Sequence, residues 1–286
     1  SGDALKVYGR LGKDPHILSH MTYCFEVPAL SFNTSIVNGE ARMIGLGAKH
    51  DTMDNWSRDE LRIMGRAPKW GFATFWKPTV EIKGKIPKAM DAWYHGQTRA
   101  MHANVMQADM WYLWHYPSAR NILPSLYEFG MGDPGLRFIP YWENTVTEVT
   151  AEAVDSIEVG LFVRPGRALV MISNFARQDQ EVTLKLLAER LFPEAQSVVW
   201  RDIDCSLEAP ESGLASPAEM AELGDNLNRD DLMGDGEDEL PDGEALEEML
   251  AGVDPVAKER ERLAMHADGD QVRLIVRQRD YRLLEV

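Results

Sequence analysis

Residues 156–175 decide the fold: Ser156-Ile-Glu-Val-Gly-Leu-Phe-Val-Arg164, then Pro165-Gly166, then Arg167-Ala-Leu-Val-Met-Ile-Ser-Asn-Phe175. Two apolar runs rich in β-branched and aromatic residues flank a Pro-Gly pair. This arrangement is typical of two antiparallel strands joined by a two-residue turn. The stretch therefore predicts a β-hairpin.

The rest of the second half continues this pattern. Short stretches in which apolar and polar residues alternate predict further strands, because alternate side chains of a strand point to opposite faces. These stretches are Glu181–Leu186, Ser197–Asp202, Gln271–Arg277 and Tyr281–Val286. Together with the hairpin they predict a small antiparallel β-sandwich.

An acidic segment interrupts the predicted sandwich between Ser206 and Arg262. It holds 18 Asp and Glu against 4 Lys and Arg, which gives it a net charge of −14. The whole chain has a formal net charge of −16, so the remainder has only −2. A segment so charged and so poor in aromatic residues cannot bury enough apolar surface to order alone, and we predict a mobile surface insertion.

Composition excludes several classes of protein. The 286 residues are 44% hydrophobic, which suits one large globular domain or two ordinary ones. Nucleic acid is disfavoured as a partner by the charge balance, and no apolar run approaches the ~18 residues of a membrane span. Cys24 and Cys205 have no metal-ligand spacing and are interpreted as buried thiols, so no metal or other cofactor is expected.

The start of the chain, Ser1-Gly2-Asp3, lacks an initiator Met. We interpret the sequence as a piece of a longer protein and expect its missing N-terminal part to be a partner of this chain. The sequence leaves export of the parent protein open, because a signal peptide would lie in that part.

The first half alternates between strand and helix signals. Strands are predicted over 16–20, 29–37 and 70–76. Ser57 and Glu60 form a capping box before a helix over 61–66, and a helical stretch near 89–98 leads into Met101–Met106. A further helix is predicted over 118–131, ended by Gly130 and Gly132 before the turn Asp133-Pro134-Gly135. This βαβα rhythm is typical of an α/β domain.

Aromatic and histidine residues concentrate in the same half. Seven of the eight tryptophans and six of the seven histidines precede residue 145, which favours a site here over simple core packing. Tryptophan faces can stack on the apolar faces of sugar rings, and histidines can donate hydrogen bonds to sugar hydroxyls, although each residue alone also fits a structural role. The candidate substrate-binding residues are His20, His50, Trp56, Trp76, His102 and Trp111.

Three carboxylates are candidates for acid–base chemistry. Glu40 is the first choice because it follows a strand and Gly39, which lets the backbone approach a ligand; a plain surface turn is the alternative. Asp51, beside His50, is the second choice and Asp109 the third. Glycoside hydrolysis generally uses two carboxyl groups that flank the scissile bond.

Several stretches carry a resemblance to a known class of enzyme. They are Asn38-Gly-Glu40, the Gly132-Asp-Pro-Gly135 turn, Phe138-Ile-Pro-Tyr-Trp-Glu-Asn144, Val163–Val170 and the closing Arg279–Val286. With them the chain resembles bacterial glycoside-hydrolase-like proteins related in architecture to the family 123 hexosaminidases. The resemblance implies the back half of a (β/α)8 barrel followed by a β-sandwich, with carbohydrate as the partner, but it transfers no catalytic pair.

The expected fold class is therefore α/β followed by all-β. A partial barrel-like domain is expected over 1–144, and a sandwich over 145–286 that is interrupted at 206–262. The expected function is that of the C-terminal part of a glycoside hydrolase, inactive alone because a closed barrel needs eight strands. A non-catalytic carbohydrate-binding or structural module is the alternative. A metal hydrolase, which would need a tight His/Asp cluster, is disfavoured because no His-x-His spacing exists and the one His-x-x-x-His pair, His16 and His20, lies in a predicted strand rather than on a helix.

Overall fold

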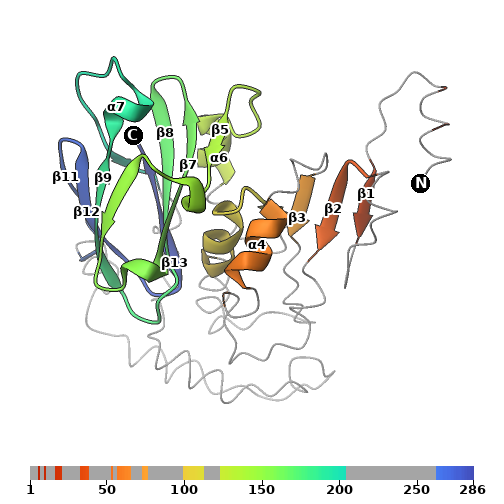
Figure 1. Cartoon of the computed structure of the whole chain (residues 1–286), viewed down its shortest axis with the longest axis horizontal. Helices are drawn as coiled ribbons and strands as arrows, with labels where there is room; N and C mark the ends of the chain where they lie inside the picture. Colours follow the sequence, from red (N-terminus) through yellow and green to blue (C-terminus); the bar gives the residue numbers. More distant parts are fainter. Residues whose placement is uncertain are drawn as a thin grey trace, which may run out of the picture.

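The structure is a computed structural model that describes residues 6, 10, 17–20, 33–38, 53, 57–65, 73–76, 99–112, 123–203 and 262–286. Figure 1 shows a parallel sheet on one side, an antiparallel β-sandwich on the other, and helical segments between them. The predicted acidic insertion lies outside the described residues, apart from Arg262 at its end.

Four strands in sequence order form the parallel sheet. They are β1 (Leu18–His20), β2 (Ser35–Asn38), β3 (Ala73–Trp76) and β4 (Trp111–Tyr112), and each pairs with the next in the chain. The strands predicted over 16–20, 29–37 and 70–76 are confirmed in their described parts, as β1, β2 and β3. The described residues form an open parallel sheet and no closed barrel. The structure therefore confirms parallel strands in the first half, and the partial barrel stays a prediction.

The helix α4 (Arg58–Gly65) lies between β2 and β3 in the chain and begins at the predicted cap. The backbone N–H of Glu60 donates to the Ser57 hydroxyl at 3.1 Å, and the N–H of Leu61 donates to the Ser57 carbonyl at 3.1 Å. The first bond satisfies an N–H group that the first turn of a helix leaves without a backbone partner, and the second is the first backbone bond of the helix itself. Leu61 and Met64 are buried, whereas Ile63 on the same helix is exposed.

Residues 99–106 are helical and buried, so Met101–Met106 belongs to a helix, and β4 follows it in the chain. α6 (Leu123–Phe129) ends as predicted. The N–H of Gly130 donates to the Tyr127 carbonyl and that of Met131 to the Leu126 carbonyl, both at 3.0 Å. With Gly130 at φ +95°, this is the Schellman arrangement that ends a helix.

The predicted sandwich is confirmed as two antiparallel sheets. One has the strand order β10 (Arg201–Asp202), β13 (Asp280–Glu285), β8 (Arg167–Asn174), β7 (Ile157–Arg164) and β5 (Arg137–Ile139). The other has the order β11 (His266–Asp268), β12 (Gln271–Val276), β9 (Gln180–Leu186) and β6 (Thr147–Thr150). The short helices η4 (Tyr141–Glu143), η5 (Val154–Ser156) and α7 (Ala188–Leu191) lie in the connections.

The predicted hairpin is β7 and β8. Arg164 pairs with Arg167 across the turn, and Gly166 has φ +74°, which a glycine adopts without steric cost. The predicted strand over 197–202 is reduced to β10. β5 lies before residue 144, where the sequence predicted the domain boundary, but it pairs with β7 of the sandwich. The position of the boundary stays a prediction.

The sheet that contains the hairpin is covered on both faces. Val159 and Leu161 of β7 pack against β9 and β12 residues such as Leu184 and Leu274, which forms the core of the sandwich. On the other face, Phe162, Met171 and Tyr281 pack against residues 99–110, α4 and α6. The hairpin strands are therefore apolar at almost every position because neither face meets water.

A buried ion pair joins the helical residues to β13. Arg99 is 2% exposed and Asp280 is 5% exposed. Arg99 Nε donates to Asp280 Oδ1 at 2.5 Å, and Arg99 Nη2 donates to the Tyr281 carbonyl at 2.6 Å. Arg277 Nε and the Tyr281 N–H also donate to the Asp280 carboxylate, at 2.9 and 2.7 Å. Both charges are thus fully partnered.

Candidate functional site

The carboxyl edge of the parallel sheet brings together three positions of interest. His20 pairs with Val37, Asn38 pairs with Trp76, and Trp76 pairs with Tyr112, so β1, β2 and β3 end at the same edge. His20 is exposed there. Loops that follow this edge carry the active sites of α/β barrels and open α/β sheets.

The opposite, amino end of β1 and β2 is held by short polar contacts. Ile17 N–H donates to the Thr34 hydroxyl at 2.8 Å, and the Ser19 hydroxyl donates to the Asn33 side-chain oxygen at 2.8 Å. Asn33 and Ser35 are buried. These bonds fix the register of the first two strands, and the register places His20 one residue short of Asn38 along the edge.

Four of the predicted site residues lie outside the described residues: Glu40, His50, Asp51 and Trp56. In sequence, Glu40 follows the end of β2 by two residues, and Trp56 precedes the α4 cap Ser57 by one. All four belong to the connection between β2 and α4.

Asp109 lies at the other end of the sheet, because it precedes β4 by two residues and the strands are parallel. Its φ is +51°, and burial raises the pKa of its carboxyl to about 6. A carboxyl group with that pKa can hold a proton near neutral pH. The topology nevertheless separates Asp109 from the edge where His20 and Trp76 lie.

The two remaining predicted residues have different surroundings. His102 is 1% exposed within the helical residues 99–106, and its ring meets that of Tyr281 edge-on at 5.9 Å, with Nδ1 3.4 Å from the tyrosine hydroxyl. It therefore packs against the sandwich rather than at the edge of the parallel sheet. Trp111 begins β4 and pairs with Phe75 of β3.

Sequence reasoning missed a cluster around Glu158, where α4 meets the sandwich. Glu158 on β7 is 4% exposed, and its Oε1 lies 3.2 Å from Arg58 Nη1 of α4. Tyr141 of η4 hydrogen-bonds to the same carboxyl group. Burial raises the pKa of Glu158 to about 7, although Arg58, Tyr141 and Arg62 act in the opposite direction.

The signal for this cluster is present in the hairpin sequence. Glu158 shares a face of β7 with Gly160 and Phe162, because side chains alternate along a strand. An acidic residue on a face that is otherwise apolar must be paired or protonated. Without the tertiary structure, nothing identified that face as one covered by α4.

Comparison with known proteins assigns no family. No protein-family model matches the chain, and no curated protein matches it in sequence. Within the described residues no helix is long and apolar enough to cross a membrane, and no group of three His, Cys, Asp or Glu side chains could hold a metal ion.

Among solved structures, the chain is similar to a noncanonic maltogenic alpha-amylase from Thermotoga neapolitana. The TM-score is 0.43 and the sequence identity 10%, over 99% of this chain and 57% of that chain. The chain therefore spans little more than half the length of that amylase, and the likeness is too distant to carry an assignment of fold or function.

Proposed function

We propose that the chain is the C-terminal part of a glycoside hydrolase that acts on a poly- or oligosaccharide, with the sugar bound at the carboxyl edge of β1–β4. The observation that carries this proposal is the register that ends β1, β2 and β3 together at His20, Asn38 and Trp76. The parallel order β1-β2-β3-β4 is also that of consecutive strands in a (β/α)8 barrel.

The spacing of such an edge suits glycoside chemistry. Neighbouring strands are about 4.8 Å apart, so groups that follow neighbouring or next-but-one strands are separated by about 5–10 Å. Retaining and inverting glycoside hydrolases place their two carboxyl groups within about this range. This spacing concerns Glu40, which follows β2 by two residues, and a group that follows a neighbouring strand. Asp51 shares the connection after β2, so the strand spacing does not set its distance from Glu40. We keep Glu40 and Asp51 as the catalytic candidates and place Asp109 outside the pair because it precedes β4.

The proposed binding residues have distinct roles. His20 and His50 donate hydrogen bonds to sugar hydroxyls, and Trp56 and Trp76 stack on sugar rings. A stacking contact contributes about 1 kcal/mol, which corresponds to roughly a fivefold change in Kd. His102, buried against Tyr281, supports the helix that precedes β4 rather than touching the sugar.

A glycan panel tests the proposal. The chain and its Trp76→Ala and His20→Ala variants are screened for binding, beside Tyr127→Ala as a matched control. Tyr127 is an aromatic residue that is 64% exposed on α6, away from the parallel sheet. We expect Kd to rise about fivefold for Trp76→Ala and to stay unchanged for Tyr127→Ala. Equal affinity in all four proteins would refute the proposed site.

Glu40→Gln separates catalysis from binding. In a glycoside hydrolase this change lowers the turnover of the full-length protein by about 100- to 10,000-fold, because proton transfer or nucleophilic attack is lost. In a non-catalytic binding module, the same variant binds as the wild type does and neither protein hydrolyses the glycan.

A further inference from the structure

We propose that Glu158 makes the docking of α4 on the sandwich depend on pH, so that ionisation of this carboxyl group loosens the helix. This inference stands on the packing of α4 against β7 and η4, independently of the proposed carbohydrate site. It assigns a regulatory role to a group that the proposed function does not use.

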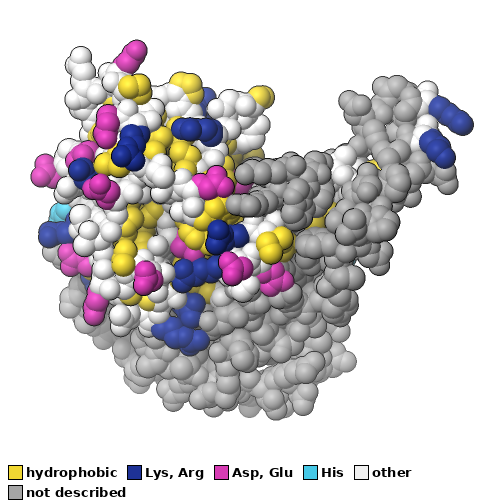
Figure 2. All heavy atoms as spheres, viewed as in Figure 1, with side chains coloured by type: hydrophobic (Ala, Val, Ile, Leu, Met, Phe, Trp, Pro, Cys, Tyr) yellow, Lys and Arg dark blue, Asp and Glu magenta, His cyan; other side chains and the backbone are white. Residues whose placement is uncertain are grey.

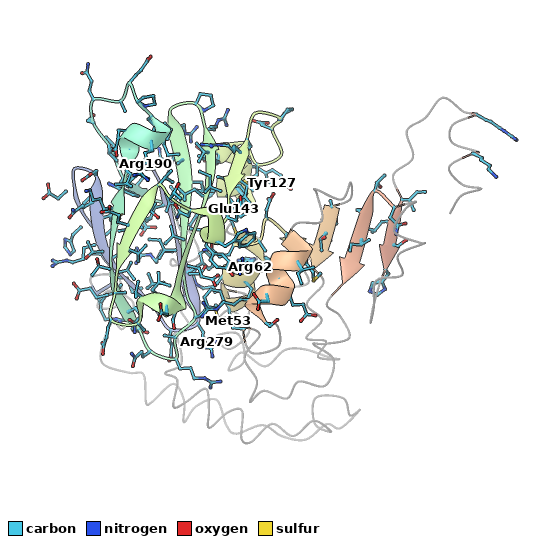
Figure 3. All side chains as sticks on the ribbon, viewed as in Figure 1. Met53, Arg62, Tyr127, Glu143, Arg190 and Arg279 are labelled. Atoms are coloured by element: carbon cyan, nitrogen blue, oxygen red, sulfur yellow. The ribbon has the colours of Figure 1, made fainter. Side chains whose placement is uncertain are left out.

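Two arginines of α4 hold the helix on the sandwich. Arg58 Nη1 donates to the Asp155 carbonyl at 3.0 Å, and the Arg58 guanidinium lies 4.9 Å from the centre of the Phe175 ring. One turn later, Arg62 lies 5.4 Å from the centre of the Trp142 ring. Figure 3 labels Arg62 of α4 and Glu143 of η4, which belong to the two elements that this Arg62–Trp142 contact joins. Figure 2 shows acidic and basic side chains interspersed on the face of the sandwich that it draws.

Glu158 lies beneath these contacts. The residue is 4% exposed, Arg58 Nη1 lies 3.2 Å from its Oε1, and Tyr141 hydrogen-bonds to the carboxyl group. The carbonyl of Glu158 accepts a 3.0 Å bond from the Gln107 side-chain amide, which also donates to the Met171 carbonyl and the Ser173 hydroxyl. Gln107 therefore ties the Glu158 backbone in place and offers its carboxylate no donor.

The charged and titratable groups that face Glu158 from neighbouring elements are Arg58 and Arg62 of α4 and Tyr141 of η4. Asp155 of η5 faces Arg58 through its backbone carbonyl only. Burial raises the pKa of Glu158 to about 7, because it outweighs the attraction of both arginines and the Tyr141 hydrogen bond. In the docked structure the carboxyl group is therefore mostly protonated below about pH 7. When α4 lifts away, water reaches the carboxyl and its pKa returns toward 4.5.

The direction of the effect follows from this difference. Between about pH 4.5 and pH 7 the docked state binds one more proton than the opened state, so rising pH favours opening. The equilibrium constant for opening is then expected to increase about tenfold between pH 6 and pH 8, where the docked carboxyl loses its proton.

Hydrogen exchange of the α4 backbone tests this inference. Protection factors for residues 58–65, corrected for the intrinsic pH dependence of exchange, are measured on the full chain at pH 6 and pH 8. Protection is expected to fall about tenfold in the wild type and to be independent of pH in Glu158→Gln. The matched control Glu148→Gln removes a carboxyl that is 63% exposed on β6 and should retain the wild-type dependence.

A second measurement needs no variant. The carboxyl carbon of Glu158 is followed by NMR in wild-type protein that carries labelled glutamate, with an expected titration midpoint of about 7. A midpoint below 5, or equal pH dependence of α4 protection in the wild type and Glu158→Gln, would overturn the inference.

Discussion

Replacing Asp280 by Asn should destabilise the protein far more than the loss of one hydrogen bond. Asp280 is 5% exposed and is the anionic partner of Arg99, which is 2% exposed. Asparagine keeps the size of the side chain, but it leaves the Arg99 charge buried without a counter-charge. Its amide N–H₂ would also face Arg277 Nε, which now donates to Oδ2 at 2.9 Å.

Removal of one partner from a buried ion pair costs about 3–5 kcal/mol, because the remaining charge keeps its desolvation penalty. We expect a loss of this size in the free energy of unfolding of Asp280→Asn, measured by urea denaturation at pH 7. Glu285→Gln on the same strand is the control. Its partners Arg167 and Arg201 are 40% and 64% exposed, so that loss should stay below about 1 kcal/mol.

The double variant Arg99→Met with Asp280→Leu distinguishes the cost of one unpaired buried charge from the net contribution of the ion pair to stability. Replacing both charges by apolar groups is often neutral or stabilising, but here Arg277 and the Tyr281 N–H also lose their acceptor. We therefore expect the double variant to recover part of the lost stability. A loss below 1 kcal/mol in Asp280→Asn, or a double variant less stable than either single variant, would refute the reasoning.

The same pair gives an acid limit to stability. Burial by itself raises the pKa of Asp280, but Arg99, Arg277 and the Tyr281 N–H outweigh it and hold the pKa below its ordinary value of 3.8. The folded state therefore gains stability from the ionised carboxyl above pH 3.8, and this gain is lost as the pH falls through the lowered pKa.

Three smaller predictions concern local structure and can be checked by urea denaturation. Ser57→Ala should cost about 1 kcal/mol because the α4 cap is lost, whereas Ser57→Gly should cost only a few tenths. Gly130→Ala should cost more than about 1 kcal/mol, since φ is +95° and the new Cβ would meet Arg164; Gly135→Ala, with open space around it, should be nearly neutral. The free energy of unfolding of Asp109→Asn should increase relative to that of the wild type by up to about 3 kcal/mol as the pH rises from 3.8 past about 6, because the wild type must then ionise a buried carboxyl group. A difference in unfolding free energy that does not change with pH would contradict the raised pKa.

Sequence reasoning succeeded where the signal is local. The Pro165-Gly166 turn set the hairpin register, Ser57 marked the start of α4, and Gly130 marked the end of α6. Each depends on the backbone conformation of a few adjacent residues, so neighbours in sequence suffice to predict it.

Sequence reasoning assigned no secondary structure to Met101–Met106. These six residues are of mixed polarity, and the structure has a helix there that is buried throughout. A helix enclosed on several sides loses the one-sided apolar stripe by which helices are recognised, so periodicity could not separate the two states.

For the candidate site, the sequence predicted strands that end at His20 and at Trp76. The register places these residues at one edge of the parallel sheet, on β1 and β3 with β2 between them. The sequence could not predict that Asp109 precedes its strand and lies at the other edge, because it did not identify β4 as the strand that follows.

The sequence by itself thus determined the hairpin, the caps and the antiparallel character of the second half, since these depend on local dihedral preferences and on alternation along single strands. The tertiary structure alone decided which polar groups are buried and what they face. Glu158 and Asp280 are both acidic residues in strands, yet burial raises the pKa of Glu158, while arginines hold that of Asp280 low. The difference lies in desolvation and charge partners contributed by residues distant in sequence.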